Sequence, residues 1–97
     1  MTPVKKVEIV TAALEIDNVV RLLEAVGVSG YTIVRDVQGS GARGRRHADE
    51  LTGALSNAYL MLACPVEQVS RIVEVVRPIL ERAGGVALVT DALWVRH

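Results

Sequence analysis

The chain has 97 residues, of which 51% are hydrophobic and 23% charged, and eleven lysines and arginines balance eleven aspartates and glutamates. This composition predicts a single globular domain over residues 1–97 and excludes a disordered chain or one with a strong overall basic or acidic field. Three aromatic residues and one cysteine exclude a single-strand-binding module built on stacked aromatics and an internal disulfide framework. No apolar run has membrane-spanning length and no signal-peptide core follows the start, so we expect a cytoplasmic protein that enters no membrane and binds no nucleic acid.

The first half of the chain has the pattern of a strand, a helix and a strand. Residues 5–11 are rich in β-branched side chains and alternate in polarity. Asp17 is a candidate N-cap for the helical spacing of apolar residues that follows it, and Gly27 is a candidate stop. Residues 31–37 then predict a second strand.

The second half repeats this pattern. Residues 58–63 predict a buried strand, and Pro65 fits the first turn of the next helix, where its missing N–H costs nothing. Pro78 falls inside the helical pattern and predicts a kink or a split, unless the helix ends near Arg77. A glycine pair then ends the helix, residues 86–90 predict the fourth strand, and a short extension closes the chain.

Two consecutive βαβ units in fewer than 100 residues predict an α+β fold, the ferredoxin-like βαββαβ sandwich. In this fold a four-stranded antiparallel sheet carries two helices on one face. The strands are apolar although the other face has no helix to cover it, so we expect a homo-oligomer. A homotrimer could pack the bare faces together.

Between the second and third strands, residues 38–57 match neither the helical nor the strand period. A loop this long in a compact domain is usually functional or disordered. It opens on glycines, whose backbone N–H groups can approach an anion closely, and continues with Arg43, Arg45, Arg46 and His47. Guanidinium groups match phosphate and carboxylate oxygens, which favours a small anionic ligand. The alternative is a flexible surface loop with solvated arginines.

Catalytic and metal motifs are weak. The glycine run matches neither the phosphate loop of nucleotide hydrolases nor the dinucleotide fingerprint. Two histidines and one cysteine make a structural zinc site an unfavoured interpretation, and no serine has a recognisable His/Asp arrangement. We therefore expect neither a catalytic residue nor a metal site, and Cys64 is expected to be a small buried residue between a strand and a helix.

Three stretches resemble the PII signal-transduction family: residues 5–10 (Lys-Lys-Val-Glu-Ile-Val), residues 27–33 (Gly-Val-Ser-Gly-Tyr-Thr-Ile) and residues 38–41 (Gln-Gly-Ser-Gly). The resemblance covers essentially the whole chain. It implies a homotrimer that binds adenine nucleotides in the clefts between subunits. It also implies a long T-loop, about residues 38–57, which docks on partner proteins, and a short B-loop, about residues 83–86.

Within the family, the loop sequence is most similar to the PII-like branch linked to bicarbonate transport and carboxysomes. This resemblance implies nucleotide-binding residues at the start of the second strand, in both loops and near the C-terminus: Thr32, Gly39, Ser40, Gly41, Arg43, Arg46, Gly84, Gly85, Val86 and Arg96. It implies bicarbonate as a second ligand, held by Gly41 and by Arg43, Arg45 and Arg46.

The chain departs from the PII pattern at two lysines, one of which binds 2-oxoglutarate and the γ-phosphate of ATP in the family. No cation lies near Asn57, and the B-loop is short and lacks a lysine. Because each charge-assisted contact is worth roughly 1.5–3 kcal/mol, we expect ADP or AMP to bind in preference to ATP, and no 2-oxoglutarate site. The T-loop also has no tyrosine that could be uridylylated.

The resemblance thus predicts a non-enzymatic signalling protein whose T-loop conformation regulates a bicarbonate transporter or a carbon-fixation partner. Two alternatives remain open. The chain could be a small phosphohydrolase acting on a nucleotide, with His47 as the base, or a trimeric interaction domain with no nucleotide ligand.

Overall fold

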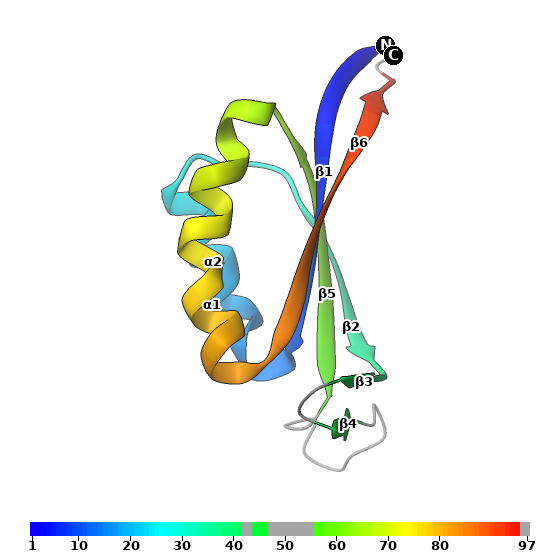
Figure 1. Cartoon of the computed structure of the whole chain (residues 1–97), viewed down its shortest axis with the longest axis vertical. Helices are drawn as coiled ribbons and strands as arrows, with labels where there is room; N and C mark the ends of the chain where they lie inside the picture. The colour runs from blue at the N-terminus through cyan, green and yellow to red at the C-terminus, as the bar shows by residue number, and fades with distance from the viewer. Residues whose placement is uncertain (42–43, 47–55, 96–97) are drawn as a thin grey trace.

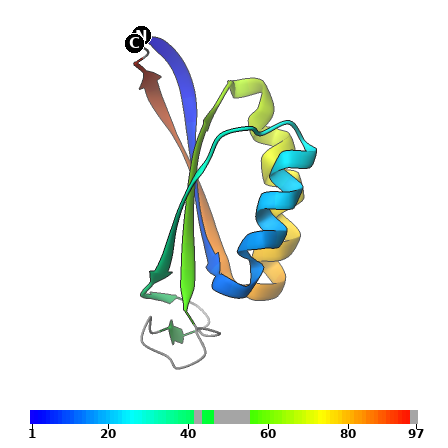
Figure 2. The same cartoon turned by 180° about the vertical axis from the view of Figure 1, so that it is seen from behind.

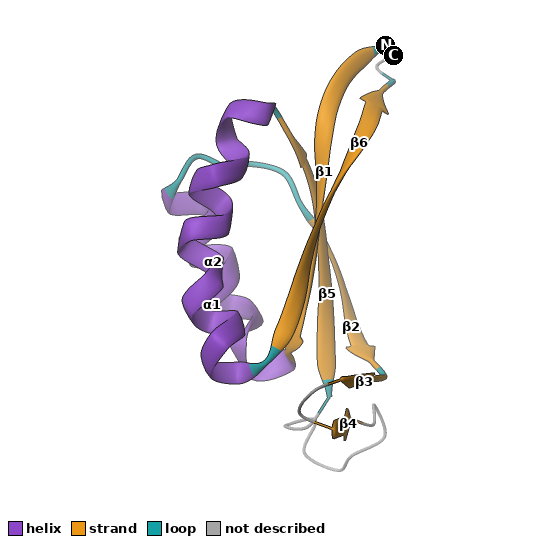
Figure 3. Ribbon diagram, in the orientation of Figure 1, coloured by secondary structure: helices purple, strands orange, loops and turns teal. Residues whose placement is uncertain are grey.

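Two helices cover one face of a four-stranded antiparallel sheet, as Figures 1 and 3 show for this computed structural model. The structure describes residues 1–41, 44–46 and 56–95. The strands of the main sheet lie in the order β2-β5-β1-β6. Their bounds are Thr2–Ala12 (β1), Thr32–Val37 (β2), Asn57–Cys64 (β5) and Gly85–Trp94 (β6). The predicted ferredoxin-like arrangement of strands and helices is confirmed.

The helices are α1 (Ile16–Ala25) and α2 (Val69–Ala83), and each follows a short 3-10 turn, Ala13–Glu15 (η1) or Val66–Gln68 (η2). Two short strands, β3 (Gly39–Gly41) and β4 (Gly44–Arg46), form a separate hairpin inside the segment expected to be a loop. Among the described residues, no helix is long and apolar enough to cross a membrane.

Strict alternation along the central strands builds the core. Val7 pairs with Leu62 and Ile9 pairs with Leu60, and all four side chains are buried beneath the helices. The apolar stripes of the helices close over them with Ile16, Val19, Leu23, Ile72, Val76 and Ile79. Because side chains in a strand alternate between faces, the residues between these positions lie on the side of the sheet that carries no helix (Figure 2).

The bare face of the sheet carries exposed apolar side chains beside a few polar ones. Val10 pairs with Tyr59 on one side and with Val86 on the other, and Glu8 pairs in the same way with Met61 and Leu88. Val86 and Leu88 are about half exposed. A face of this composition is typical of a surface that packs against another protein.

Both helical segments begin at a different residue from the one that the sequence pattern predicted. The sequence pattern predicted Asp17 as an N-cap, but α1 begins at Ile16 and Asp17 lies in its first turn, without a capping hydrogen bond from a side chain. A negative charge in the first turn still interacts favourably with the helix dipole. Pro65 was expected inside the next helix, but it precedes η2 in an extended conformation, with ψ of 151°.

Pro78 does not split α2, which runs unbroken over fifteen residues. A proline in a helix interior costs roughly 3 kcal/mol because it removes a hydrogen bond and crowds the preceding turn. The buried side chains of Ile72, Val76 and Ile79, before and after the proline, hold this helix on the sheet and offset that cost.

The last strand was also underestimated. The sequence pattern ended it at residue 90 and added a separate extension, but β6 continues to Trp94 because its whole length pairs with β1. Thr2 pairs with Trp94, so the two termini lie side by side at one end of the sheet (Figure 1). The first strand also starts earlier than predicted, at Thr2 instead of residue 5. The outer ends of both strands were predicted too short because their exposed residues do not alternate in polarity and so carry little periodic signal.

Gly85 sits where a side chain has no room. Its φ is +127°, and a Cβ there would lie 2.2 Å from the backbone oxygen of Val10. We expect Gly85→Ala to lower the free energy of unfolding by about 2–5 kcal/mol, from backbone strain and the forced contact together. Urea unfolding at one fixed protein concentration measures the change.

Gly30→Ala is the matched control, because a Cβ there meets nothing within 4 Å and the backbone is not left-handed. This variant should be as stable as the parent chain, or up to about 1 kcal/mol more stable. Equal stability of the two variants would show that the contact at Gly85 is not as close as described.

Candidate functional site

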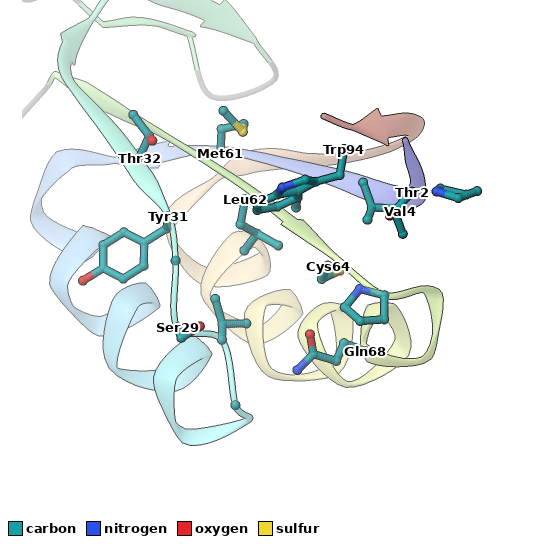
Figure 4. Close-up of a pocket in the computed structure, with 16 residues that line it drawn as sticks. Thr2, Val4, Ser29, Tyr31, Thr32, Met61, Leu62, Cys64, Gln68 and Trp94 are labelled. Carbon is teal, nitrogen blue, oxygen red and sulfur yellow. The ribbon is translucent and has the colours of Figure 1, made fainter. Parts of the chain in front are cut away.

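A cavity of about 820 Å³ opens at the end of the sheet where the termini meet (Figure 4). Thr32, the first residue of β2, lines it together with Met61 and Trp94. The walls are mainly apolar, and Ser29 and Gln68 add polar groups. Thr32 is a residue for which the family resemblance implied nucleotide contact, so the cavity includes one of the predicted site residues.

The turn after α1 positions this side of the cavity. Gly27 takes a φ of +97°, a conformation that glycine adopts without strain. The chain then turns back, and the N–H of Val28 donates to the carbonyl oxygen of Leu23 at 3.0 Å. Val28 is buried, which anchors the turn and leaves Ser29 at the rim of the cavity (Figure 4).

At the other end of β2, a β-bulge directs the chain out of the sheet. The register of β2 on β5 shifts between Val34 and Val37, and Asp36 has a φ of +59°. Aspartate tolerates this left-handed conformation better than most residues. After the bulge the backbone turns into β3, next to the start of β5, where a Cβ on Gly39 would lie 3.5 Å from the Asn57 amide nitrogen.

The hairpin brings the predicted loop glycines beside the predicted loop arginines. In its backbone register, Gly39 pairs with Arg46, Ser40 with Arg45 and Gly41 with Gly44. Five predicted site residues therefore lie in one small two-stranded unit, a proximity that the sequence pattern did not predict. Arg43, His47 and Arg96 lie outside the described residues.

The second set of predicted residues lies on the opposite edge of the sheet. Gly84 follows α2 with a φ of +83°, and its carbonyl oxygen accepts a hydrogen bond from the Thr11 hydroxyl at 2.8 Å. Gly85 and Val86 then begin β6. The predicted B-loop is thus a tight turn between α2 and β6, and the hydrogen bond from Thr11 ties it to β1.

Within one chain these two sets cannot meet. β2 and β6 are the two edge strands, three strand spacings or about 14 Å apart across the sheet. Both sets nevertheless lie at the same end of it, because Thr11 pairs with Gly85, Ala12 with Asn57, and Asn57 with Val37. A second copy whose β6 edge lay beside this β2 edge would bring the two sets closer together than they are within one chain.

A polar cluster interrupts the apolar bare face. The Tyr59 hydroxyl donates to the Glu8 carboxylate at 2.7 Å, and the Lys6 ammonium lies 3.7 Å from the other oxygen of that carboxylate. The hydrogen bond to Glu8, then desolvation and the negative charge of Glu8, raise the pKa of Tyr59. The sequence pattern gave no sign of this cluster, because the three residues lie on two strands and meet only through the strand register.

Cys64 is the small buried residue that was expected. It ends β5, it is 3% exposed, and its burial raises the pKa of its thiol. A thiol with a raised pKa is largely protonated and a poor nucleophile. Cys64 therefore serves packing at the floor of the cavity.

A family model, Nitrogen regulatory protein P-II, matches residues 4–97 of this chain. Among solved structures, the chain is similar to CPII, a nitrogen regulatory PII-like protein from Thiomonas intermedia K12, bound to ADP, AMP and bicarbonate. The two are 31% identical, with a TM-score of 0.86 over 93% of this chain and 86% of CPII.

Two further structures match less closely. A PII-like signalling protein from Thermus thermophilus is 25% identical, with a TM-score of 0.78, over 94% of this chain and 88% of that protein. GlnK of B. subtilis, solved as a complex with ATP, is 20% identical with a TM-score of 0.70 over 95% of this chain and 84% of GlnK, which supports the fold alone. A search among curated proteins gives no significant match.

The raised pKa of Tyr59 gives a spectroscopic test of the polar cluster. Tyr31→Phe leaves Tyr59 as the one tyrosine, and we expect Glu8→Gln in that background to lower the pKa of Tyr59, because the negative charge is lost. Phenolate absorbance against pH measures it. Because the pKa of Tyr59 is higher in the folded chain than in the unfolded chain, the protonated phenol stabilises the fold. This stabilisation is fully present below pH 10.0, the ordinary tyrosine pKa, and it is lost as the pH rises through the higher pKa of folded Tyr59.

Glu74→Gln is the matched control, since Glu74 lies on α2, on the other side of the molecule from the bare face. It should leave the titration of Tyr59 unchanged. A titration that stays the same in Glu8→Gln would mean that the hydrogen bond between Tyr59 and Glu8 does not form in solution.

Proposed function

Because the chain belongs to the nitrogen regulatory protein P-II family, whose members are regulators and not enzymes, we propose that it senses adenine nucleotides, with bicarbonate as a second ligand. ADP or AMP is the preferred nucleotide. The bound state sets the conformation of the T-loop, residues 38–57, which in turn regulates a bicarbonate transporter or a carbon-fixation protein. The observation that carries the proposal is the similarity to CPII, which binds ADP, AMP and bicarbonate.

We further propose a homotrimer with the site between subunits. PII proteins are trimers, and two features of this chain agree with that assembly. The bare face of the sheet exposes Val34, Val86 and Leu88, which a neighbouring copy would cover. The predicted ligand residues lie on opposite edges of the sheet, so two copies can complete a site that one copy cannot.

In the proposed site more than one subunit contributes. Gly85 and Trp94 lie at opposite ends of β6, so the B-loop and the C-terminal arginine that contact one nucleotide come from different chains. The residues proposed for the nucleotide are Thr32, Gly39, Ser40, Gly41, Arg43, Arg46, Gly84, Gly85, Val86 and Arg96. Bicarbonate is held by Gly41, Arg43, Arg45 and Arg46.

The chemistry of these groups suits short anions. Backbone N–H groups of glycines can approach phosphate oxygens, and guanidinium groups bind them through paired hydrogen bonds. The hairpin supports this assignment, because its backbone pairs Gly39 with Arg46 and Ser40 with Arg45. Asn57, beside Gly39, brings no positive charge for a third phosphate, which favours ADP or AMP over ATP.

Two anions in one loop would favour each other's binding. Both anions would be held by Gly41, Arg43 and Arg46, so the second anion would bind groups whose conformational freedom the first has already reduced. The coupling is reciprocal: if bicarbonate tightens ADP binding, ADP tightens bicarbonate binding by the same factor.

The nucleotide preference is tested by titration calorimetry with AMP, ADP, ATP and cyclic AMP, each with and without bicarbonate. We expect ADP or AMP to bind at least about tenfold more tightly than ATP, since roughly 1.5–3 kcal/mol of phosphate contact is missing. Bicarbonate should increase that affinity beyond the effect of equimolar chloride at the same pH. 2-Oxoglutarate should change nothing.

The variant Arg43→Ala tests whether the T-loop contributes to the affinity for ADP. It should weaken ADP binding by about ten- to a hundredfold and remove the effect of bicarbonate, while the trimer stays intact by native mass. If no adenosine phosphate binds, the result would favour the alternative of an interaction domain with no nucleotide ligand. Tight ATP binding enhanced by 2-oxoglutarate would contradict the proposed ligands.

A further inference from the structure

Two opposite charges lie on the bare face of the sheet, on its central strand β1. Lys6 and Glu8 are two residues apart on this strand, so their side chains share the face that carries no helix. The Tyr59 hydroxyl donates to Oε2 of Glu8 at 2.7 Å, and the Lys6 Nζ lies 3.7 Å from Oε1 of the same carboxylate. The Lys6 side chain is 40% exposed and the Glu8 side chain 25%.

One chain satisfies these two charges only in part. Among residues 1–41, 44–46 and 56–95, Lys6 has this ion pair but donates no hydrogen bond, and Glu8 accepts one hydrogen bond, on Oε2. An ammonium group has three N–H donors, and each carboxylate oxygen can accept more than one hydrogen bond. In a single chain, water therefore completes the hydrogen bonding of Lys6 and of Oε1 of Glu8.

Apolar side chains surround the charges. In the strand register Glu8 lies between Met61 and Leu88, and Leu88 is about half exposed. A copy of the chain that covers these apolar groups also removes water from Glu8 and Lys6. Removing water from a charge is costly unless another polar group takes the place of the water.

A second copy offers the groups that can replace this water. Its own Lys6 brings N–H donors and its own Glu8 brings an acceptor, so the bare face is complementary in charge to another bare face. In a cyclic trimer the same two patches meet at every interface. A contact between Lys6 of one copy and Glu8 of the next therefore occurs three times and closes into a ring. Such a ring requires the middle of β1 to lie near the symmetry axis.

We propose that in the trimer the Lys6 ammonium of each copy pairs with the Glu8 carboxylate of the next copy, and that this ring of ion pairs sets how the copies are oriented. The proposal rests on the trimer of the proposed function and adds to it the residues that decide which surfaces meet. Apolar contacts are non-directional and tolerate several orientations. A wrong orientation would leave covered charges without partners, and this disfavours it. The hydrogen bond from Tyr59 holds the Glu8 carboxylate in place for the contact.

Charge reversal tests the ring. Lys6→Glu gives a chain with two negative charges on this part of β1, and Glu8→Lys gives a chain with two positive charges. In either variant alone, every interface of the trimer would join like charges. We expect the protein concentration at which half of the trimer is dissociated to rise by at least about tenfold in each variant. Sedimentation velocity measures this concentration, and circular dichroism checks that each chain is folded.

Mixing the two variants separates contacts between copies from contacts within one chain. In every mixed trimer two of the three interfaces join opposite charges, so an equimolar mixture should assemble at a lower concentration than either variant alone. Positions 6 and 8 of each variant chain still carry like charges. Recovery on mixing can therefore come only from contacts between copies.

Lys5→Glu is the matched control for Lys6→Glu. Lys5 is the adjacent residue of β1, so it lies on the opposite face of the sheet, and its side chain pairs with the exposed Asp91. This variant reverses a charge of the same kind but outside the face that a neighbouring copy would cover. Its trimer should dissociate at the same concentration as the parent trimer.

Lys6→Met and Glu8→Gln repeat the test if a charge-reversed chain does not fold. Each substitution removes one charge and leaves its partner without a counterion in the covered face, so each alone should raise the dissociation concentration by at least a few-fold. In their mixed trimers the contact between Lys6 and Glu8 forms again at one interface. The mixture should therefore assemble at a lower concentration than either variant.

The outcomes distinguish the ring from the proposed function. If the parent protein is a trimer that binds ADP, but the variants assemble as the parent does or their mixture recovers nothing, the nucleotide sensor stands and the ring is wrong. If the parent protein is a monomer at every concentration, the proposed trimer is wrong and the ring is wrong with it.

Discussion

The strand order β2-β5-β1-β6 is the constraint on which the site depends. It places β2, which leads into the T-loop, and β6, which follows the B-loop, on opposite edges of one sheet. The core residues Val7, Ile9, Leu60 and Leu62 hold this order, because a shift of one residue in either central strand would expose them. The edges that carry the proposed ligand residues are therefore held apart within one chain, and a second copy would be needed to bring them together.

The bare face and the divided site are two consequences of the same architecture. Both helices pack on one side, so the other side keeps apolar residues and the Lys6–Glu8–Tyr59 cluster. A trimer would cover this face and bring one subunit's edge near the next subunit's edge. Assembly and ligand binding would then share one surface, and a nucleotide bound between copies would stabilise the assembly by mass action.

Much of the fold was predictable because its signals are local. The buried alternation of β1 and β5, the helical spacing in α1 and α2 and the stop at Gly27 all lie within short windows of sequence. Features that depend on pairing between distant segments were missed. The extension of β6 to Trp94 needs β1 beside it, the bulge at Asp36 needs β5, and the intact helix through Pro78 needs the sheet beneath it.

The candidate site shows the same difference between local signals, which can be found in the sequence, and features that arise only when distant segments meet. Family motifs supply Thr32 and the loop glycines as candidates, whereas the cavity beside Thr32 gave no signal in the sequence, because its walls meet only in the folded chain.

The measurement that most directly tests a site shared between copies is ADP binding by a mixed assembly of two variants, Arg43→Ala and Arg96→Ala. Each variant alone binds weakly, but in a 1:1 mixed trimer about a quarter of the sites should regain both arginines and parent affinity. A mixture whose subunits exchange by native mass but which recovers no tight sites would contradict the account.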